Sequence, residues 1–408
     1  MRKKFLLLVG MFGVAIGAAS FDTANALTNS QISGATGLPV GMSTSEDGRY
    51  IAFLSNDNTL VSGDTNNVDA FLRDTVSNTT TMLSVSTSGI KENSFSRRVM
   101  LSGNARYALI SSNAGNLATG GVNGSTNVYL RDIKLGTTSL VIAGGSGISF
   151  YGEGLSEDGR FIYYSGVGGP DDGKLFVKDT VSNTTTRVDI NTSGTGIAWT
   201  IQTQVDLSCD GRFAVIASGA SDLVSGDTNG YTDIFLIDSM NGHIIKNLTI
   251  NANGSSQFPR ITCDGNHVVF YSDANNLVST DTNSSSDLFE YDIPNDSFKL
   301  VSLDNSGNQY GTLSSATGGL SPNDASADMS LDGRYIVFSI DKLTGSTETS
   351  GQILLRDTVS NTTTALTSGS VIADRPQITY DGRTTYYAYA STTSYLQYRT
   401  IYVATSYL

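Results

Sequence analysis

One short phrase, Ser-x-Asp-Gly-Arg followed by β-branched and aromatic residues, recurs along this chain with small variations. Successive copies lie 49 to 68 residues apart, a spacing that fits one blade of a β-propeller. A unit of this size cannot bury its apolar residues alone, so the copies must pack against one another. The seven copies begin at Ser45, Ser102, Ser156, Ser208, Thr262, Ser330 and Thr379.

The first copy shows how one unit divides into strands. Residues 41–44 lead into an Asp-Gly dipeptide at 47–48, which favours a tight hairpin turn. Residues 50–54 are apolar on both faces, so they predict a strand buried between neighbouring sheets. Residues 70–74 and 79–83 then complete a four-stranded antiparallel unit. The octapeptide Asp-Thr-Val-Ser-Asn-Thr-Thr-Thr recurs identically at 74–81, 179–186 and 357–364, which indicates duplicated units.

We therefore predict an all-β fold, a seven-bladed β-propeller of four-stranded antiparallel blades, with six or eight blades as alternatives. The seventh unit supplies strands around 385–389 and 400–404 and then nearly stops, so it lacks a fourth strand. The segment Leu27–Ser33 precedes the first unit and has no other assigned place. We predict that it pairs with residues 400–404, which closes the ring and protects an open sheet edge.

The repeat resembles a known family. Ser-x-Asp-Gly-Arg-Tyr-Ile-Ala-Phe at 45–53, followed by Asp-x-Phe-Leu-Arg-Asp at 69–74, is similar to the WD-like repeat of TolB-type β-propellers. The resemblance covers essentially the whole chain after its N-terminal segment. It implies the propeller fold but no single function, because such repeats occur in binding, scaffold and enzyme proteins. The separate N-terminal domain of TolB has no counterpart here, so the partners of TolB are not implied.

The N-terminus is typical of a secretory signal. Basic residues at 2–4 are followed by an apolar stretch at 5–18 and by the small-residue site Ala24-Asn25-Ala26. We expect cleavage near Ala26, which divides the chain into a signal peptide (1–26) and one propeller domain (27–408) that is secreted or periplasmic. The apolar stretch is shorter than the roughly 20 residues of a membrane span, and no transmembrane segment is expected in the mature chain.

The charge balance limits the partners. The formal net charge is −13, with 25 basic and 38 acidic residues. Nucleic acid requires a basic footprint, so we expect no nucleic-acid partner. The same acidity argues against an electrostatic hold on anionic lipid.

No residue pattern identifies catalysis, and we assign no catalytic residues. The chain has two histidines, and His267 is interpreted as a ring packed at the start of a strand. No Gly-x-Ser-x-Gly motif supports a hydrolase triad. The repeat is not the Asp-box of sialidase-type propellers, since glycine follows the aspartate directly and Trp199 is the only tryptophan.

The predicted function is an exported binding or scaffold module that recognises a protein or carbohydrate partner through rim loops. The alternative is an extracellular propeller enzyme that hydrolyses a glycoside or lactone. A carboxylate pair that faces the channel, with one raised pKa, would favour the enzyme. A rim patch of tyrosines would favour binding, and the last unit is rich in them: Tyr386, Tyr387, Tyr389, Tyr395, Tyr398 and Tyr402.

Three loops before the third strand of a unit share an Asp-Thr-Asn sequence followed by a further aspartate. Calcium favours such clustered carboxylate and amide oxygens, and it is the one cofactor that the sequence suggests. Asp and Asn also cap turns by bonding to nearby backbone amides, so Asx-turn structure is the alternative. The candidate metal ligands are Asp64, Asn66, Asp69, Asp227, Asn229, Asp233, Asp281, Asn283 and Asp287.

The two cysteines occupy the same position in successive units. Cys209 and Cys263 each precede the aspartate of the turn. In an exported protein this suggests a disulfide. In a seven-fold ring, equivalent points on adjacent blades come within disulfide range only about 6 Å from the axis, so a bridge would lie at the channel rim. Farther out, the two residues would be buried thiols.

Overall fold

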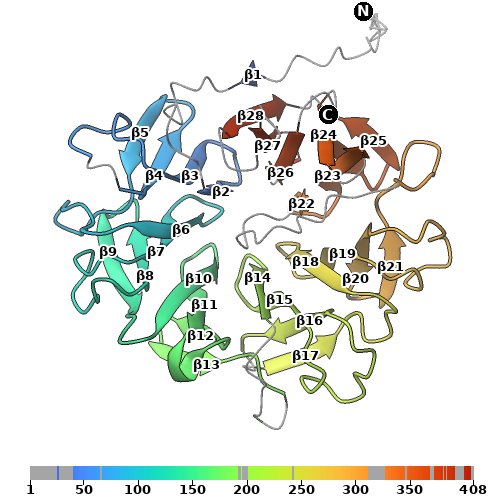
Figure 1. Cartoon of the computed structure of the whole chain (residues 1–408), viewed down its shortest axis with the longest axis horizontal. Coiled ribbons are helices and arrows are strands. Elements are labelled where there is room, and N and C mark those ends of the chain that lie inside the picture. Colours follow the sequence, from blue (N-terminus) through green and yellow to red (C-terminus); the bar gives the residue numbers. More distant parts are fainter. Residues whose placement is uncertain are drawn as a thin grey trace, which may run out of the picture.

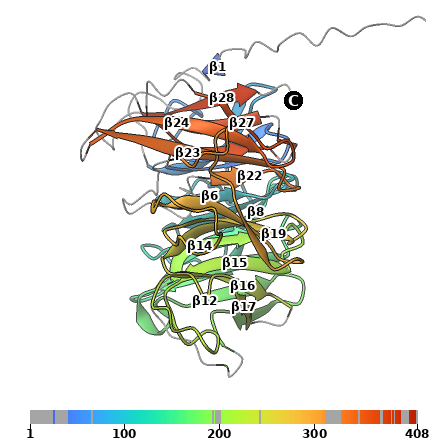
Figure 2. The ribbon, with the colours of Figure 1, turned by 90° about the vertical axis from the view of Figure 1, so that its right-hand side faces the viewer.

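The protein is a ring of antiparallel β-sheets around a central axis, seen face-on in Figure 1 and edge-on in Figure 2. This computed structural model describes residues 25–26, 40–64, 67–191, 194, 201–240, 243–310, 327–344, 347–367, 372–379, 381–382, 384–390 and 399–405. The described part contains no helix long and apolar enough to cross a membrane. All strand pairs within the sheets are antiparallel, for example β3 with β4.

Each of six blades contains four consecutive strands, here called A to D in chain order. Blades 1 to 3 comprise β2 (Val40–Thr44), β3 (Tyr50–Ser55), β4 (Asp69–Asp74), β5 (Thr79–Met82); β6 (Ser96–Leu101), β7 (Tyr107–Ser112), β8 (Asn127–Asp132), β9 (Thr137–Ile142); and β10 (Ser149–Leu155), β11 (Phe161–Val167), β12 (Leu175–Asp179), β13 (Thr184–Arg187). A short 3-10 helix, η1 (Gly169–Asp171), lies between β11 and β12.

Blades 4 to 6 follow the same order. They comprise β14 (Ile201–Leu207), β15 (Phe213–Ser218), β16 (Asp233–Asp238), β17 (His243–Asn247); β18 (Ser256–Ile261), β19 (His267–Ser272), β20 (Asp287–Asp292), β21 (Ser297–Leu300); and β22 (Ala327–Met329), β23 (Tyr335–Thr344), β24 (Thr347–Asp357), β25 (Thr362–Ala365). The four-stranded antiparallel propeller predicted from the repeats is therefore confirmed.

The blade count differs from the prediction. The C-terminal unit forms only β26 (Ile372–Ile378), β27 (Thr384–Ala390) and β28 (Arg399–Thr405). Its sheet is extended by β1 (Asn25–Ala26), a two-residue strand from the other end of the chain that pairs with β28. The structure thus shows six complete blades rather than seven, because the last unit has no fourth strand of its own. The segment 27–33, predicted to close the ring, lies outside the described residues.

The apolar residues of the second strand lie between blades, as predicted. In β3, Ile51, Ala52 and Phe53 are all fully buried. Ala52 and Leu54 belong to a cluster that also contains residues of β6 and β7 in the next blade. Burial of strand B from both sides therefore joins neighbouring blades, which accounts for its lack of polar–apolar alternation.

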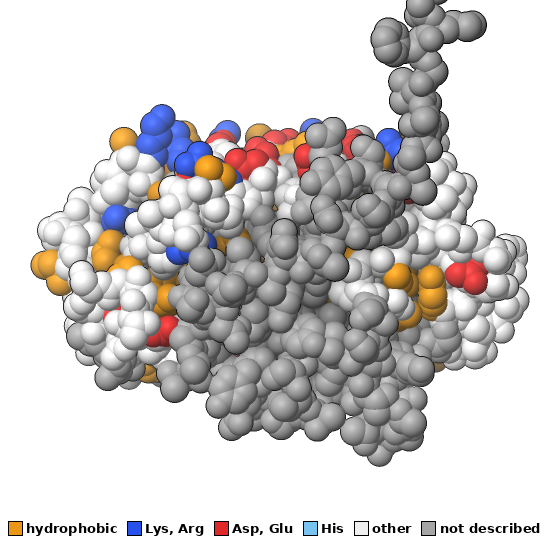
Figure 3. Space-filling model, turned by 90° about the horizontal axis from the view of Figure 1, so that it is seen from above, with side chains coloured by type: hydrophobic (Ala, Val, Ile, Leu, Met, Phe, Trp, Pro, Cys, Tyr) orange, Lys and Arg blue, Asp and Glu red, His pale blue; other side chains and the backbone are white. Residues whose placement is uncertain are grey.

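The strand directions define two faces of the disc. The A–B and C–D turns lie at one end of each blade, which we call the turn face, and the B–C loops lie at the other, the loop face. Arg49 in an A–B turn bonds Asp74 at a C–D turn, at 2.7 Å between Nη2 and Oδ2, so these turns are held together. In Figure 3, which looks down on the edge of the disc, acidic and basic side chains gather along one border.

Candidate functional site

A cavity of about 170 Å³ lies at the turn-face end of the channel. Its wall is formed by the ends of the A strands, because the residues that precede each Asp-Gly turn converge there. The residue two positions before the first Ser or Thr of each repeat lines this cavity in all seven units. These residues are Ser43, Met100, Gly154, Asp206, Arg260, Asp328 and Gln377.

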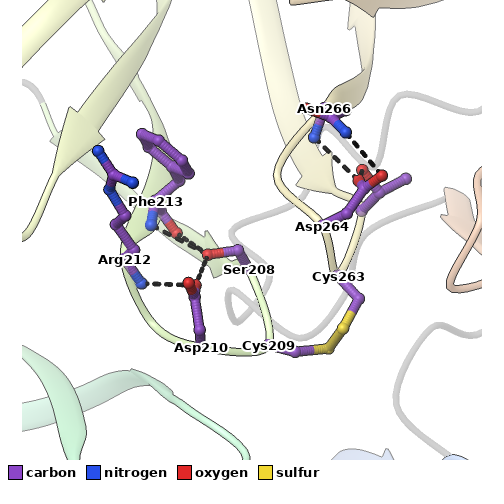
Figure 4. Close-up of a disulfide and its surroundings, with 9 residues drawn as sticks. Ser208, Cys209, Asp210, Arg212, Phe213, Cys263, Asp264 and Asn266 are labelled. Atoms are coloured by element: carbon purple, nitrogen blue, oxygen red, sulfur yellow. Dashed lines mark hydrogen bonds between the residues drawn. A yellow bond between two sulfur atoms is a disulfide. The ribbon is translucent and has the colours of Figure 1, made fainter.

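The repeated phrase builds the turns that surround the cavity (Figure 4). In blade 4 the Ser208 hydroxyl donates to Asp210 Oδ1 at 2.7 Å and accepts from the Phe213 N–H at 3.0 Å. Gly211 adopts φ +68°, which only glycine reaches without strain. Serine, aspartate and glycine therefore each have a role in the turn, and the second unit forms the same turn with Asn104 and with Ala105 at φ +55°.

A disulfide joins two of these turns across adjacent blades (Figure 4). The Cα atoms of Cys209 and Cys263 are 4.5 Å apart, and both residues line the cavity. This is the channel-rim position that the sequence argument required for a bridge. Backbone bonds continue the contact, with Cys209 N–H donating to the Cys263 carbonyl at 3.0 Å and Glu157 N–H to the Cys209 carbonyl at 3.1 Å. The bridge therefore covalently supports one side of the mouth.

Three ionisable side chains from adjacent A strands meet in the cavity wall. Arg260 Nη1 lies 3.7 Å from Asp206 Oδ1. Each aspartate also accepts a backbone N–H from the next blade: Asp206 from Ile261 at 2.8 Å and Asp328 from Ile378 at 3.0 Å. Burial raises the pKa of Asp328 to about 6, and the nearby charge of Arg260 opposes this rise. Burial likewise raises the pKa of Asp206.

A pair of carboxyl groups lies at the same mouth. Glu46 and Glu157 precede the turn aspartates of blades 1 and 3, and Gly103 lies between them in the second unit. A Cβ at Gly103 would come within 2.2 Å of Glu46 Oε1, so glycine makes room for this carboxyl. Burial and the contact with Glu157 raise the pKa of Glu46 to about 8. Glu46 therefore carries a proton at neutral pH.

Sequence reasoning missed these channel groups. The repeated aspartates were explained by the turns, and the candidate ligands were all assigned to the B–C loops. The useful signal was the register of strand A, because the position two residues before the repeat Ser or Thr is aspartate, arginine and aspartate in three successive units.

The predicted metal loops lie on the loop face and differ from one another. In blade 4, Asp233 accepts the amide groups of Asn229 and Asn247, at 3.0 and 3.1 Å to Oδ2. Asp227 also accepts from Asn247. Asn229 Oδ1 also accepts the Tyr231 N–H at 2.9 Å, which is the backbone contact of an Asx turn.

In blade 5, Asp287 is fully buried and Asp281 nearly so. Burial and the charge of Asp281 raise the pKa of Asp287. Asn283 donates to the Tyr310 carbonyl at 3.2 Å, and its side chain also contacts Asp287, which opposes the rise in the pKa of that carboxyl.

In blade 1, Asp69 lies beside a third carboxyl, Glu92, and near Asp64. Burial raises the pKa of Asp69 to about 6, while contact with Glu92 opposes the rise. Asn66 lies outside the described residues. Glu92 was not predicted, because it comes from the connection between blades rather than from the Asp-Thr-Asn loop.

The remaining candidates add little chemistry. His267 lies at the start of β19, with Nδ1 3.0 Å from Glu290 Oε1, and this contact raises its pKa. The ring thus lies at the start of a strand, the position predicted for it. Trp199, Tyr395 and Tyr398 lie outside the described residues.

Within the described residues, one group of three His, Cys, Asp or Glu side chains has its ligand atoms within 4.8 Å of one another. It consists of Glu157, Cys209 and Cys263. Both sulfurs are in the disulfide, so this group is no thiolate metal site.

Comparison with known proteins bears on the fold. No protein-family model matches the chain, and no curated protein sequence matches it. It is similar in structure to oligogalacturonate lyase from Vibrio parahaemolyticus, with a TM-score of 0.59, 12% identity and coverage of 95% of this chain and 98% of the other. It is also similar to an oligogalacturonate lyase in complex with manganese, with a TM-score of 0.58 and 13% identity. That match covers 95% of this chain and 96% of the other.

The tricorn protease is also similar, with a TM-score of 0.51 and 14% identity over 90% of this chain and 35% of that one. At these identities the similarities concern architecture alone. They support a β-propeller, whereas the TolB-type assignment stays a prediction from the repeat.

Proposed function

We propose that this protein is an exported binding module whose channel mouth receives a basic side chain of a protein partner. The observation that carries the proposal is the charge of the cavity wall: Asp206, Asp328 and Glu157 line it with one guanidinium, that of Arg260. A cavity of about 170 Å³ is too small for a folded segment but holds one side chain. An excess of carboxylates in a partly desolvated site attracts a cation more strongly than it would in water.

The same negative charge makes this cavity unsuited to the substrate that is named for its structural neighbours. An oligogalacturonate is a polyanion, and a carboxylate-rich cavity repels it. The described lining also includes no aromatic residue on which a sugar ring could stack. Lyase activity is therefore not carried over from the similar structures.

Exposed apolar side chains on the same face favour a macromolecular partner. Val76, Val181 and Val359 occupy one position of the octapeptide turn and are 75, 76 and 70% exposed. Leu135 and Met240 are exposed in the corresponding turns of blades 2 and 4. Single exposed apolar residues are ordinary, but repetition around one face is suited to a protein surface that covers the mouth.

Export and ring closure belong to the same proposal. The register of β1 pairs Asn25 with Val403 and Ala26 with Tyr402. Cleavage after Ala26 would remove the two residues of β1, and we propose that residues 27–33 then pair with β28 in their place. N-terminal sequencing of the exported protein tests the cleavage. Deletion of residues 27–33 should lower the melting temperature, and an unchanged temperature would disprove closure.

The binding test uses a fluorescein-labelled hexalysine peptide and measures anisotropy. We expect binding that weakens with added salt, and we expect Asp206→Asn and Asp328→Asn each to weaken it about fivefold, equivalent to ~1 kcal/mol. Asn retains an acceptor oxygen for the backbone N–H, so the fold should persist. Asp171→Asn, in a B–C loop on the loop face, removes the same charge and is the matched control.

Equal losses in all three variants would disprove a specific channel site. Binding of maltohexaose instead of hexalysine would favour the carbohydrate partner and overturn the proposal.

Glu46 and Glu157 favour one second candidate, an acid–base enzyme that uses a protonated carboxyl beside a carboxylate. Glu157 is close enough to contribute to the raised pKa of Glu46. A glycosidase needs roughly 5 Å or more between its carboxyls, so glycoside hydrolysis fits poorly. A chromogenic lactone or ester panel tests this candidate, and turnover lost in Glu46→Gln but kept in Asp171→Asn would support it.

A further inference from the structure

Three B–C loops of equal length provide an internal comparison on the loop face, away from the channel mouth. They span 112–127, 218–233 and 272–287 in blades 2, 4 and 5, and each begins with serine. Each ends on the first residue of strand C, which is Asn127, Asp233 or Asp287. All three end residues are fully buried.

Blade 2 shows what surrounds this position. Asn127 Nδ2 donates to the carbonyl oxygens of Ser112 and Ala114 at 3.2 Å and of Val122 and Ser125 at 2.9 Å. Four carbonyl dipoles therefore converge on one nitrogen. Such an arrangement has a strongly negative potential at its centre, which the partial positive charge of the amide hydrogens offsets.

Blade 4 has an aspartate, Asp233, at the position of Asn127. Two of its hydrogen-bond donors come from residues 247 and 249, after strand C. The Thr249 hydroxyl donates to Asp233 Oδ1 at 2.6 Å. Asn247 Nδ2 donates both to Asp233 Oδ2, at 3.1 Å, and to Asp227 Oδ2, at 3.2 Å. One amide group thus bridges the two carboxylates.

Blade 5 keeps both carboxylates and loses the bridging amide. Leu300 stands where blade 4 has Asn247, since each pairs with the phenylalanine two residues into strand C. Ser302 still donates to Asp287 Oδ1 at 2.5 Å. However, the Oδ2 atoms of Asp281 and Asp287 are buried and have no hydrogen-bond partner within the described part of the chain.

No ion pair within the described residues joins either carboxylate to a lysine or arginine. The nearest donor recorded for Asp281 is Gln309 Nε2, at a long 3.5 Å from Oδ1. Two buried carboxylates without a positive partner are costly, because burial removes the water that would solvate them.

We propose that the blade 5 loop binds one calcium ion between the carboxylates of Asp281 and Asp287. By position, the carbonyls of Ser272, Ala274, Thr282 and Ser285 correspond to the four that converge on Asn127 in blade 2, and they are the further ligands we assign. The ion then takes the place filled by amide hydrogens in blades 2 and 4. An all-oxygen set of six or more ligands suits Ca²⁺, whereas Zn²⁺ prefers nitrogen and sulfur. This site is independent of the function proposed for the channel mouth.

The test is isothermal titration of calcium chloride into the metal-free protein. Asp287→Asn reproduces the residue of blade 2, so it should fold, as circular dichroism will verify. We expect it to lower the calcium stoichiometry by one relative to the unchanged chain. Leu300→Asn, which restores the amide of blade 4, should weaken the same site at least tenfold. Asp227→Asn changes the blade 4 counterpart of Asp281 and should leave calcium binding unchanged.

Two results would overturn the proposal. If the unchanged protein takes up no calcium at millimolar concentration, the blade 5 loop is not a calcium site. If Asp227→Asn and Asp287→Asn lower the stoichiometry equally, the loops bind calcium without regard to the bridging amide.

Discussion

The two faces of the disc treat their carboxylates differently. On the turn face, five blades pair the arginine of the repeat with the aspartate that ends strand C: Arg49–Asp74, Arg106–Asp132, Arg160–Asp179, Arg212–Asp238 and Arg334–Asp357. On the loop face, aspartates at the other end of strand C are buried, and only some have amide partners. In each of these repeats, the carboxylate on the turn face is therefore neutralised by an arginine of the same blade. The partners of the carboxylate on the loop face differ from blade to blade.

The difference shows what each position contributes. The turn-face aspartate holds two turns together, so its partner belongs to the repeat and recurs with it. The loop-face aspartate lies where backbone carbonyls converge, so its environment demands positive charge from an amide or a cation. Turn-face variants should therefore change stability in the same way with or without calcium, whereas the loop face should respond to it.

The largest effect is expected from Gly211→Ala on the turn face. The positive φ costs about 1–2 kcal/mol for a residue with a side chain. The new Cβ would also meet Cβ atoms of Phe161 and Ser156 at 2.8 Å in the preceding blade. We expect a total loss of about 3 kcal/mol in urea unfolding, with the excess arising from overpacking.

Gly226→Ala, in the B–C loop of the same blade, is the matched control. Gly226 also has a positive φ, +89°, but no atom of the described residues lies within 4 Å of the position that a Cβ would occupy. Gly226→Ala should therefore lose only the part of the unfolding free energy that comes from the positive φ. Equal losses at both positions would show that contact between blades at the turn face adds nothing.

Calcium removal should come next in size and affect the loop face. Calcium at about 100 times its dissociation constant stabilises the folded protein by roughly 2.7 kcal/mol. Melting in excess chelator should therefore occur a few degrees lower than in millimolar calcium. Asp287→Asn should abolish most of this difference, and a full response in that variant would place the stabilising ion elsewhere.

The smallest effect is expected from Arg160→Ala. Arg160 Nη2 lies 2.9 Å from Asp179 Oδ2, but the arginine side chain is 40% exposed, so solvent screens the pair. We expect only a small loss of stability at pH 7. The arginine holds the pKa of Asp179 below its ordinary value, so the pair stabilises above that value and its contribution is lost as the pH falls.

Arg160→Ala should therefore raise the pKa of Asp179 in an NMR titration, and its destabilisation should shrink in acid. A loss that stayed constant down to pH 2 would assign the effect to contact of the guanidinium with Phe161, 4.7 Å away, rather than to the ion pair.

Much of the fold was predictable because the repeat encodes local structure. The Asp-Gly turn, the doubly buried second strand and the four-strand unit depend on residues close together in sequence. The blade count was less predictable. Seven copies of the phrase form six complete blades, since a phrase marks only the A–B turn and the last unit ends before a fourth strand.

The candidate sites were predicted unevenly. The Asp-Thr-Asn loops stood out, yet the sequence alone did not separate Asp281 and Asp287 from their counterparts in blade 4. That distinction depends on Leu300 and Asn247, which lie on a neighbouring strand. Glu46 and Glu157 are more than 100 residues apart, and only ring geometry brings their carboxyls into contact.

The sequence by itself determined the unit of this protein: its turns, its buried strand and the repetition that makes units pack as blades. These follow from short-range backbone preferences and from runs of apolar residues that do not alternate with polar ones. The tertiary structure decided which charges meet. Strands of different blades bring Arg260 close to Asp206 and Asp328. Contacts between neighbouring strands likewise decide which carboxylate oxygens of blade 5 lack a partner within the described residues. The electrostatics of both sites depend on burial and distance, which a linear sequence does not contain.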